Sequence, residues 1–241
     1  MTLPMARSGT RSPPPLDEPR RAATHYLNPK EAIMEDLKES AAAAPASQHG
    51  ALRIVREEHE RLAAVVHGMR YLARAIGEKA AQPDLRVFRA MLLYISEYPE
   101  RLHHPKEDLY LFAPLRAHTH AHDETLAALE AQHANGEAMV RRLEHLLLRY
   151  EFGGEPEFAP FAGQVECYAD FYFRHMRTEE DVIFPALREH LSAGDWEKAD
   201  RAFASNIDPL AGTDLKHDFE RLFTVIVSIT PAPVGLGPAL Q

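Results

Sequence analysis

The stretch HHPKEDLYLF, residues 103–112, decides the fold, because it recurs in related form as HMRTEEDVIF at 175–184. Each copy contains His-x-x-x-Glu. Residues four apart lie on one face of a helix, so the imidazole and the carboxylate of each copy can bind the same metal ion. The two pairs are His103 with Glu107, and His175 with Glu179.

A lone histidine precedes each pair, His59 the first and His133 the second. The two lone histidines are 74 residues apart, and both members of the pairs recur after 72 residues. Two segments that carry the same nitrogen and carboxylate groups at matched offsets predict a site with pseudo-twofold symmetry that holds two metal ions.

The histidines interrupt apolar patterns that are typical of an antiparallel helical bundle. Three segments have apolar residues at alternating steps of three and four, and His59, His133 and His175 each occupy a position in such a seam. Glu179 follows in the last seam. A carboxylate in a core costs free energy unless it is paired or bound to metal, so the seam itself predicts a metal ion.

Pro99 and Pro105 interrupt the pattern of the second helix of the bundle. Proline lacks the N–H group that a helix needs and kinks or breaks it. His103 and Glu107 share a face only if the helix continues, and we expect a kinked but continuous helix.

Composition narrows the class of protein. The 241 residues include 27 basic and 36 acidic side chains, and the net charge of −9 argues against a nucleic-acid partner. One cysteine, Cys167, excludes a disulfide within the chain and fits a cytoplasmic location. We expect no membrane association, because no apolar run reaches the roughly 20 residues that cross a bilayer, and no secretory signal is visible.

The chain is predicted to be all-α. Its expected core is an up-down-up-down antiparallel four-helix bundle with extra C-terminal helices. The expected divisions are a mostly disordered N-terminal tail at 1–48, the bundle at 49–192, helices packed on the bundle at 193–230, and a loose tail at 231–241.

Four separated motifs resemble those of the hemerythrin-like, or HHE cation-binding, family and occur in its order. They are EEHERL (57–62), HHPKEDLYLF (103–112), LEAQH (129–133) and RHMRTEEDVIFPAL (174–187). The resemblance covers roughly residues 48–230 and implies a bundle that holds a non-haem di-iron centre. By family position, the terminal ligands would be His59, His103, His133 and His175, and the bridging carboxylates would be Glu107 and Glu179.

Coordination numbers agree with this implication. Four imidazoles and two bridging carboxylates fill eight positions, and an oxo or hydroxo bridge fills two more, so about two of the twelve positions on two six-coordinate irons stay open. A ligand set of imidazoles and carboxylates suits iron and manganese, whereas zinc usually takes four ligands in a tetrahedral arrangement. Iron is expected, and manganese and zinc remain alternatives.

The chain departs from the oxygen-carrying hemerythrins. On the third helix those proteins have His-x-x-x-His, whereas here His133 is followed four residues later by Glu137. On the fourth helix their acidic ligand lies five residues after the histidine, whereas here Glu179 lies four residues after His175. Reversible oxygen transport is therefore not implied. Glu137 is either a seventh ligand or a solvated side chain. Four other histidines are expected outside the ligand set: His104 in an outer shell or at the surface, and His118, His120 and His122 in a solvated loop.

The leading functional hypothesis is a non-haem di-iron protein that senses or handles O2, NO, peroxide or iron, with a protein partner still to be identified. The first alternative is an enzyme, a di-iron oxidoreductase that consumes peroxide. The second is a helical interaction module with a vestigial metal site. A binding protein is favoured over an enzyme, but the sequence does not show turnover.

Overall fold

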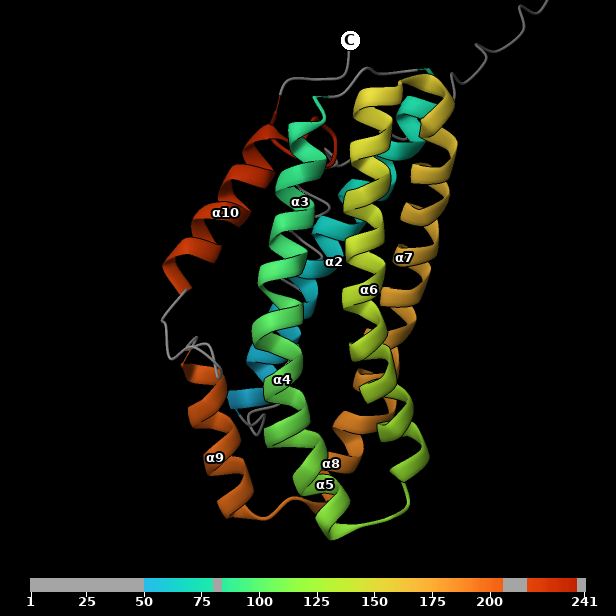
Figure 1. Ribbon diagram of the computed structural model, residues 1–241. Helices are drawn as coiled ribbons and strands as arrows, with labels where there is room; N and C mark the ends of the chain where they lie inside the picture. The colour runs from blue at the N-terminus through green and yellow to red at the C-terminus, as the bar shows by residue number, and fades with distance from the viewer. Residues whose placement is uncertain (1–49, 80–83, 206–215, 238–241) are drawn as a thin grey trace, which may run out of the picture. The chain divides into compact units, whose positions relative to one another are not determined.

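The computed structural model describes residues 50–79, 84–205 and 216–237, and the expected tail at 1–48 lies outside these ranges. Within them the chain is helical and contains no β-strand. Four long helical segments alternate in direction, and two further helices lie beside them (Figure 1). The prediction of an all-α bundle with extra C-terminal helices is confirmed.

The first and third bundle helices are single α-helices, and the second and fourth consist of several segments. The first is α2 (Gly50–Gly77) and the third is α6 (Asp123–Gly153). The second consists of α3 (Arg86–Glu97), η1 (Pro99–His103), α4 (His104–Glu107), η2 (Asp108–Phe112) and α5 (Ala113–His118). After the turn η3 (Glu155–Glu157), the fourth consists of α7 (Phe158–Thr178), η4 (Glu179–Ile183) and α8 (Phe184–His190).

The second and fourth helices continue through their prolines by changing to π-helical geometry, at η1 and η2 in the second helix and at η4 in the fourth. In the first of these segments, the N–H groups of Leu102 and His103 both donate to the Tyr98 carbonyl, at 3.0 and 3.2 Å. A π-helical turn holds an extra residue, and such turns occur often at functional sites. Each is followed within two residues by a proline, in order Pro105, Pro114 and Pro185.

The bundle core has two apolar parts. The larger apolar cluster joins α2, α3, α6 and α7 through buried residues such as Leu72, Phe88, Leu143 and Phe161. The smaller apolar cluster joins α2, α5, α8 and α9 through residues such as Leu52, Phe184 and Trp196. Each fully buried large side chain stabilises the fold by about 1.5–3 kcal/mol. The seam histidines lie between the two clusters.

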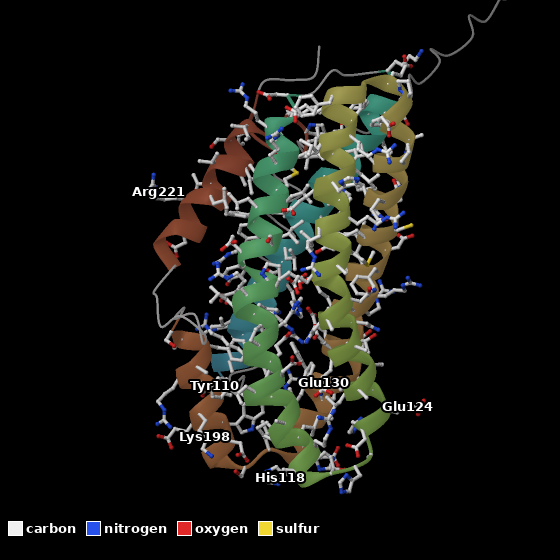
Figure 2. All side chains as sticks on the ribbon, in the orientation of Figure 1. Tyr110, His118, Glu124, Glu130, Lys198 and Arg221 are labelled. Carbon is white, nitrogen blue, oxygen red and sulfur yellow. The ribbon has the colours of Figure 1, made fainter. Side chains whose placement is uncertain are left out.

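Two further helices cover one side of the bundle (Figure 1): α9 (Ala193–Ala204) packs on α2, and α10 (Lys216–Ile229) packs on α3. Lys198 of α9 and Arg221 of α10 are exposed and point away from the bundle (Figure 2). Residues 231–237, where we expected a loose tail, turn back onto α10, and the Leu236 N–H donates to the Val227 carbonyl at 2.8 Å. None of the described helices has the length and apolar character that crossing a membrane requires.

Candidate metal centre

A buried cluster of imidazoles and carboxylates lies between the two apolar clusters. Its members come from all four bundle helices, and each is at most 7 % exposed. The structure brings together all six residues of the predicted ligand set: His59, His103, Glu107, His133, His175 and Glu179.

Glu107 faces histidines from both sequence repeats. Its Oε1 lies 3.3 Å from His103 Nε2 and 3.8 Å from His59 Nε2. Its Oε2 lies 3.6 Å from His133 Nε2. One carboxylate oxygen is therefore directed at the histidine pair His59 and His103, which we name the first half of the centre. The other oxygen is directed at the pair His133 and His175, the second half.

Glu179 repeats this arrangement from the opposite side. Its Oε2 lies 3.2 Å from His59 Nε2 in the first half. Its Oε1 lies 3.2 Å from His175 Nε2 and 3.5 Å from His133 Nε2 in the second half. Each half thus has two imidazole nitrogens and one oxygen from each of two carboxylates.

The inward atoms fit a metal better than they fit one another. The Nε2 atoms of His59, His133 and His175 and all four oxygens of Glu107 and Glu179 are buried without a hydrogen-bond partner. Leaving so many polar atoms unsatisfied would cost several kcal/mol. Ligand atoms at about 2.0–2.2 Å from one ion lie roughly 3–4 Å apart, which is the separation found here.

The outer nitrogen of every histidine in the two halves meets an oxygen acceptor. In the first half, His59 Nδ1 donates to Glu180 Oε1 at 2.9 Å, and His103 Nδ1 donates to Glu58 Oε2 at 2.7 Å. Because ionised carboxylates only accept, the proton lies on Nδ1 and the Nε2 lone pair points inward.

The second half has the matching bonds. His133 Nδ1 donates to Asp108 Oδ1 at 2.9 Å, and His175 Nδ1 donates to Gln132 Oε1 at 3.0 Å. Outer partners of this kind orient metal-binding imidazoles and make them better donors. All four Nε2 atoms therefore point inward, where each could bind a metal in place of a proton.

These four outer partners were not predicted from the sequence. Glu58 and Gln132 each precede a lone histidine, and Asp108 and Glu180 each follow a paired glutamate. Their offsets, 74 and 72 residues, equal those of the ligand set. Comparing the residues adjacent to each ligand in the two repeats would have found them.

In the absence of metal, protons compensate the clustered carboxylates. Burial disfavours a charged His59, but the neighbouring carboxylates of Glu179 and Glu180 outweigh burial and raise its pKa to about 9. The pKa of His133 rises to about 10 in the same balance. Burial, followed by the charge of Glu179, raises the pKa of Glu107. A divalent cation would displace these protons.

His104 is buried and lies beside the second half, so the surface position is wrong and the outer-shell position remains a prediction. Its ring stacks on His133, with centroids 4.1 Å apart, and its Nε2 accepts a hydrogen bond from the Tyr172 hydroxyl at 2.8 Å. One of its nitrogens lies within 4.8 Å of ligand atoms of Glu107, His133 and His175. Burial lowers the pKa of His104 well below its ordinary value, so its imidazole is neutral.

Other candidates lie away from the cluster. The Glu137 side chain is 62 % exposed and pairs with Arg141, which corresponds to the solvated alternative. His118 lies at the far end of the bundle, where α5 ends (Figure 2), and contacts Asp195. His120 is exposed, and His122 is half-buried.

An antiparallel four-helix bundle with a doubled His/His-x-x-x-Glu cluster at its centre defines a class of helical proteins in which the cluster could hold metal ions. Comparison with protein families places the chain within that class: the hemerythrin HHE cation binding domain matches residues 50–187. The chain belongs to this family, as its motifs indicated. A search of curated proteins finds no match to the chain.

Proposed function

We propose that this chain is a non-haem di-iron protein that senses or handles a small ligand such as O2, NO or peroxide. The observation that supports the proposal most strongly is the geometry of Glu107 and Glu179, each of which directs one oxygen at each half of the centre. A carboxylate in this position is suited to bridging two ions. We further propose a cytoplasmic location, which the single cysteine fits.

The residues of the first half would hold one ion and those of the second half the other, with both glutamates shared. Imidazole and carboxylate are ligands that iron and manganese accept. When bound, iron supplies coordination positions at which a diatomic gas or peroxide can bind and exchange electrons.

The protein's own contribution is to enclose the centre. Phe184 stacks beside His59 with ring centroids 6.2 Å apart, and Phe112 stacks beside His133 at 5.6 Å. Both phenylalanines are at most 1 % exposed. Apolar walls exclude water and bulky substrates, which favours small uncharged ligands over larger ones.

The test is metal content followed by an optical spectrum. Protein produced in iron-supplemented cells should contain about two iron ions per chain, and peroxide or nitric oxide should change its visible absorption. Less than half an equivalent of any transition metal would contradict the proposal. If the protein instead contained two equivalents of manganese or zinc, the two-ion centre would be supported but iron would be the wrong metal.

An enzyme that consumes peroxide is the second candidate. The observation that favours it is the buried Tyr172 hydroxyl, which donates to His104 beside the second half and places a proton donor near the ligand cluster. Sustained consumption of peroxide by iron-loaded protein, lost in Tyr172→Phe without loss of iron, would favour the enzyme. A single stoichiometric reaction would favour the binding protein.

A further inference from the structure

The two halves of the centre have the same ligands but different outer partners. In the pseudo-twofold relation, Glu180 of the first half corresponds to Asp108 of the second, and both are carboxylates at the partly exposed rim. The other pair is Glu58 and Gln132, which differ in charge. The first half therefore has a carboxylate behind each histidine, whereas the second has one carboxylate and one neutral amide.

Several hydrogen-bond donors and a cation surround the buried Glu58 carboxylate. Glu58 is 4 % exposed, its Oε2 accepts from His103 Nδ1 at 2.7 Å, and it also accepts from the Tyr98 hydroxyl. The ammonium of Lys106 is a further neighbouring charge. Hydrogen bonds from several donors stabilise a buried anion. Gln132, in the corresponding position, offers His175 only an amide oxygen at 3.0 Å.

We propose that the two metal positions are inequivalent and that Glu58 makes them so, by giving the first half the higher affinity for a divalent cation. A negative acceptor behind His103 increases the electron density at its inward Nε2, and the charge itself attracts a cation. Neither effect operates through a neutral amide. The proposal rests on the proposed two-ion function, and it assigns Glu58 a positioning role through His103.

His104 opposes this order, because it adds a nitrogen beside the second half, where Met176 occupies the corresponding position in the first. Two charges act in the same direction: Glu100 Oε2 lies 3.4 Å from His104 Nδ1, and Arg56 Nε lies 3.7 Å from Glu180 Oε2 in the first half.

His104 Nε2 already accepts the Tyr172 hydroxyl at 2.8 Å, and Glu100 contacts His104 and none of the six ligands at ion-pair distance. Arg56 is partly exposed. The buried Glu58 carboxylate, which lies directly behind the ligand His103, should therefore outweigh these groups.

Reciprocal substitutions test the proposal. The metal-free full-length protein is titrated with cobalt(II), and two stepwise dissociation constants are measured by calorimetry and visible absorption. Glu58→Gln should weaken the tighter step by about 10–100-fold, the range for loss of an outer partner, and leave the weaker step unchanged. Gln132→Glu should strengthen the weaker step. This gain of affinity cannot result from damage to the fold.

Ligand deletions assign each step to a half. His103→Ala should abolish the tighter step in the wild-type background, and His175→Ala the weaker. In the double variant Glu58→Gln with Gln132→Glu the assignment should reverse. Circular dichroism verifies that each variant is folded.

The outcomes separate the two proposals. Binding of two cobalt ions with Glu58→Gln indistinguishable from wild type would overturn the inequivalence and leave the two-ion centre intact, as would loss of the tighter wild-type step in His175→Ala. Failure of the wild-type protein to bind cobalt would overturn both.

Discussion

The larger apolar cluster and the layer of histidines and glutamates lie in the same bundle but obtain their stability differently. Phe88 and Phe161 pack edge to face in the larger apolar cluster, with centroids 5.1 Å apart, and need nothing from outside the chain. Glu107 and Glu179 are equally buried, yet their oxygens have no hydrogen-bond partner. From this comparison we expect the bundle to fold by burial of apolar area, and its central layer to need a cation or protons to offset the clustered carboxylates.

Removal of a shared carboxylate should have the largest effect on the central layer. Glu179→Ala should lose most of the bound metal, because Glu179 faces both halves. Glu137→Ala is the matched control on a neighbouring helix: its exposed carboxylate pairs with Arg141, and the metal content should stay at the wild-type level. Elemental analysis of both variants makes the comparison, and equal retention would contradict a bridging role for Glu179.

Metal removal should lower stability without unfolding the bundle. Ions that bind only the folded form stabilise it by mass action, by about 4 kcal/mol when the free ion is at 1,000 times its dissociation constant. We expect chelated protein to keep most of its helical circular dichroism at 25 °C and to melt at a lower temperature than loaded protein. Identical melting curves would show that the ligands share no buried ion, whereas a chelated protein without helix would show that the apolar clusters are insufficient.

A cavity in the larger apolar cluster should lower the stability of metal-loaded and chelated protein by the same amount. Phe161→Ala removes a fully buried ring and should cost about 3–5 kcal/mol in the free energy of unfolding, in loaded and chelated protein equally. Metal content should be unchanged, since Phe161 is not part of the His and Glu layer. Denaturant titrations of the two forms measure this, and a cost confined to loaded protein would show that the regions are coupled.

The melting temperature of the chelated protein should depend on pH more strongly than that of the metal-loaded protein, and this effect should be smaller than those above. The pKa values of His59 and His133 in the metal-free fold, about 9 and about 10, lie above the ordinary 6.5. Raised values mean that their stabilising contribution is complete below pH 6.5 and is lost as the pH rises through 9 to 10. Chelated protein should therefore melt at a lower temperature at pH 10 than at pH 7.

Loaded protein should show a weaker dependence on pH over the same interval, because its histidines are already neutral. Metal binding should also release protons, and buffer-dependent calorimetric heats measure how many. A chelated protein whose midpoint rises between pH 7 and 10 would contradict the assigned protonation.

Local spacing was sufficient to predict much of the fold. His103 and Glu107 share a helical face because they are four residues apart, and His59 and His133 interrupt apolar seams whose period requires bundle packing. These relations hold within single helices, so they are visible in a single sequence. The all-α bundle follows from them, and the family was indicated by the resemblance of four motifs; both are confirmed.

Only the tertiary structure decided which groups meet across helices. The partner of each histidine Nδ1 depends on how one helix is rotated against the next, so Glu58 with His103 and Gln132 with His175 could not be inferred from spacing within one helix. The same rotation directs Glu137 outward. The π-helical segments add a residue to a turn, which alters the rotation of all that follows, and hydrophobic periodicity does not report such a local change.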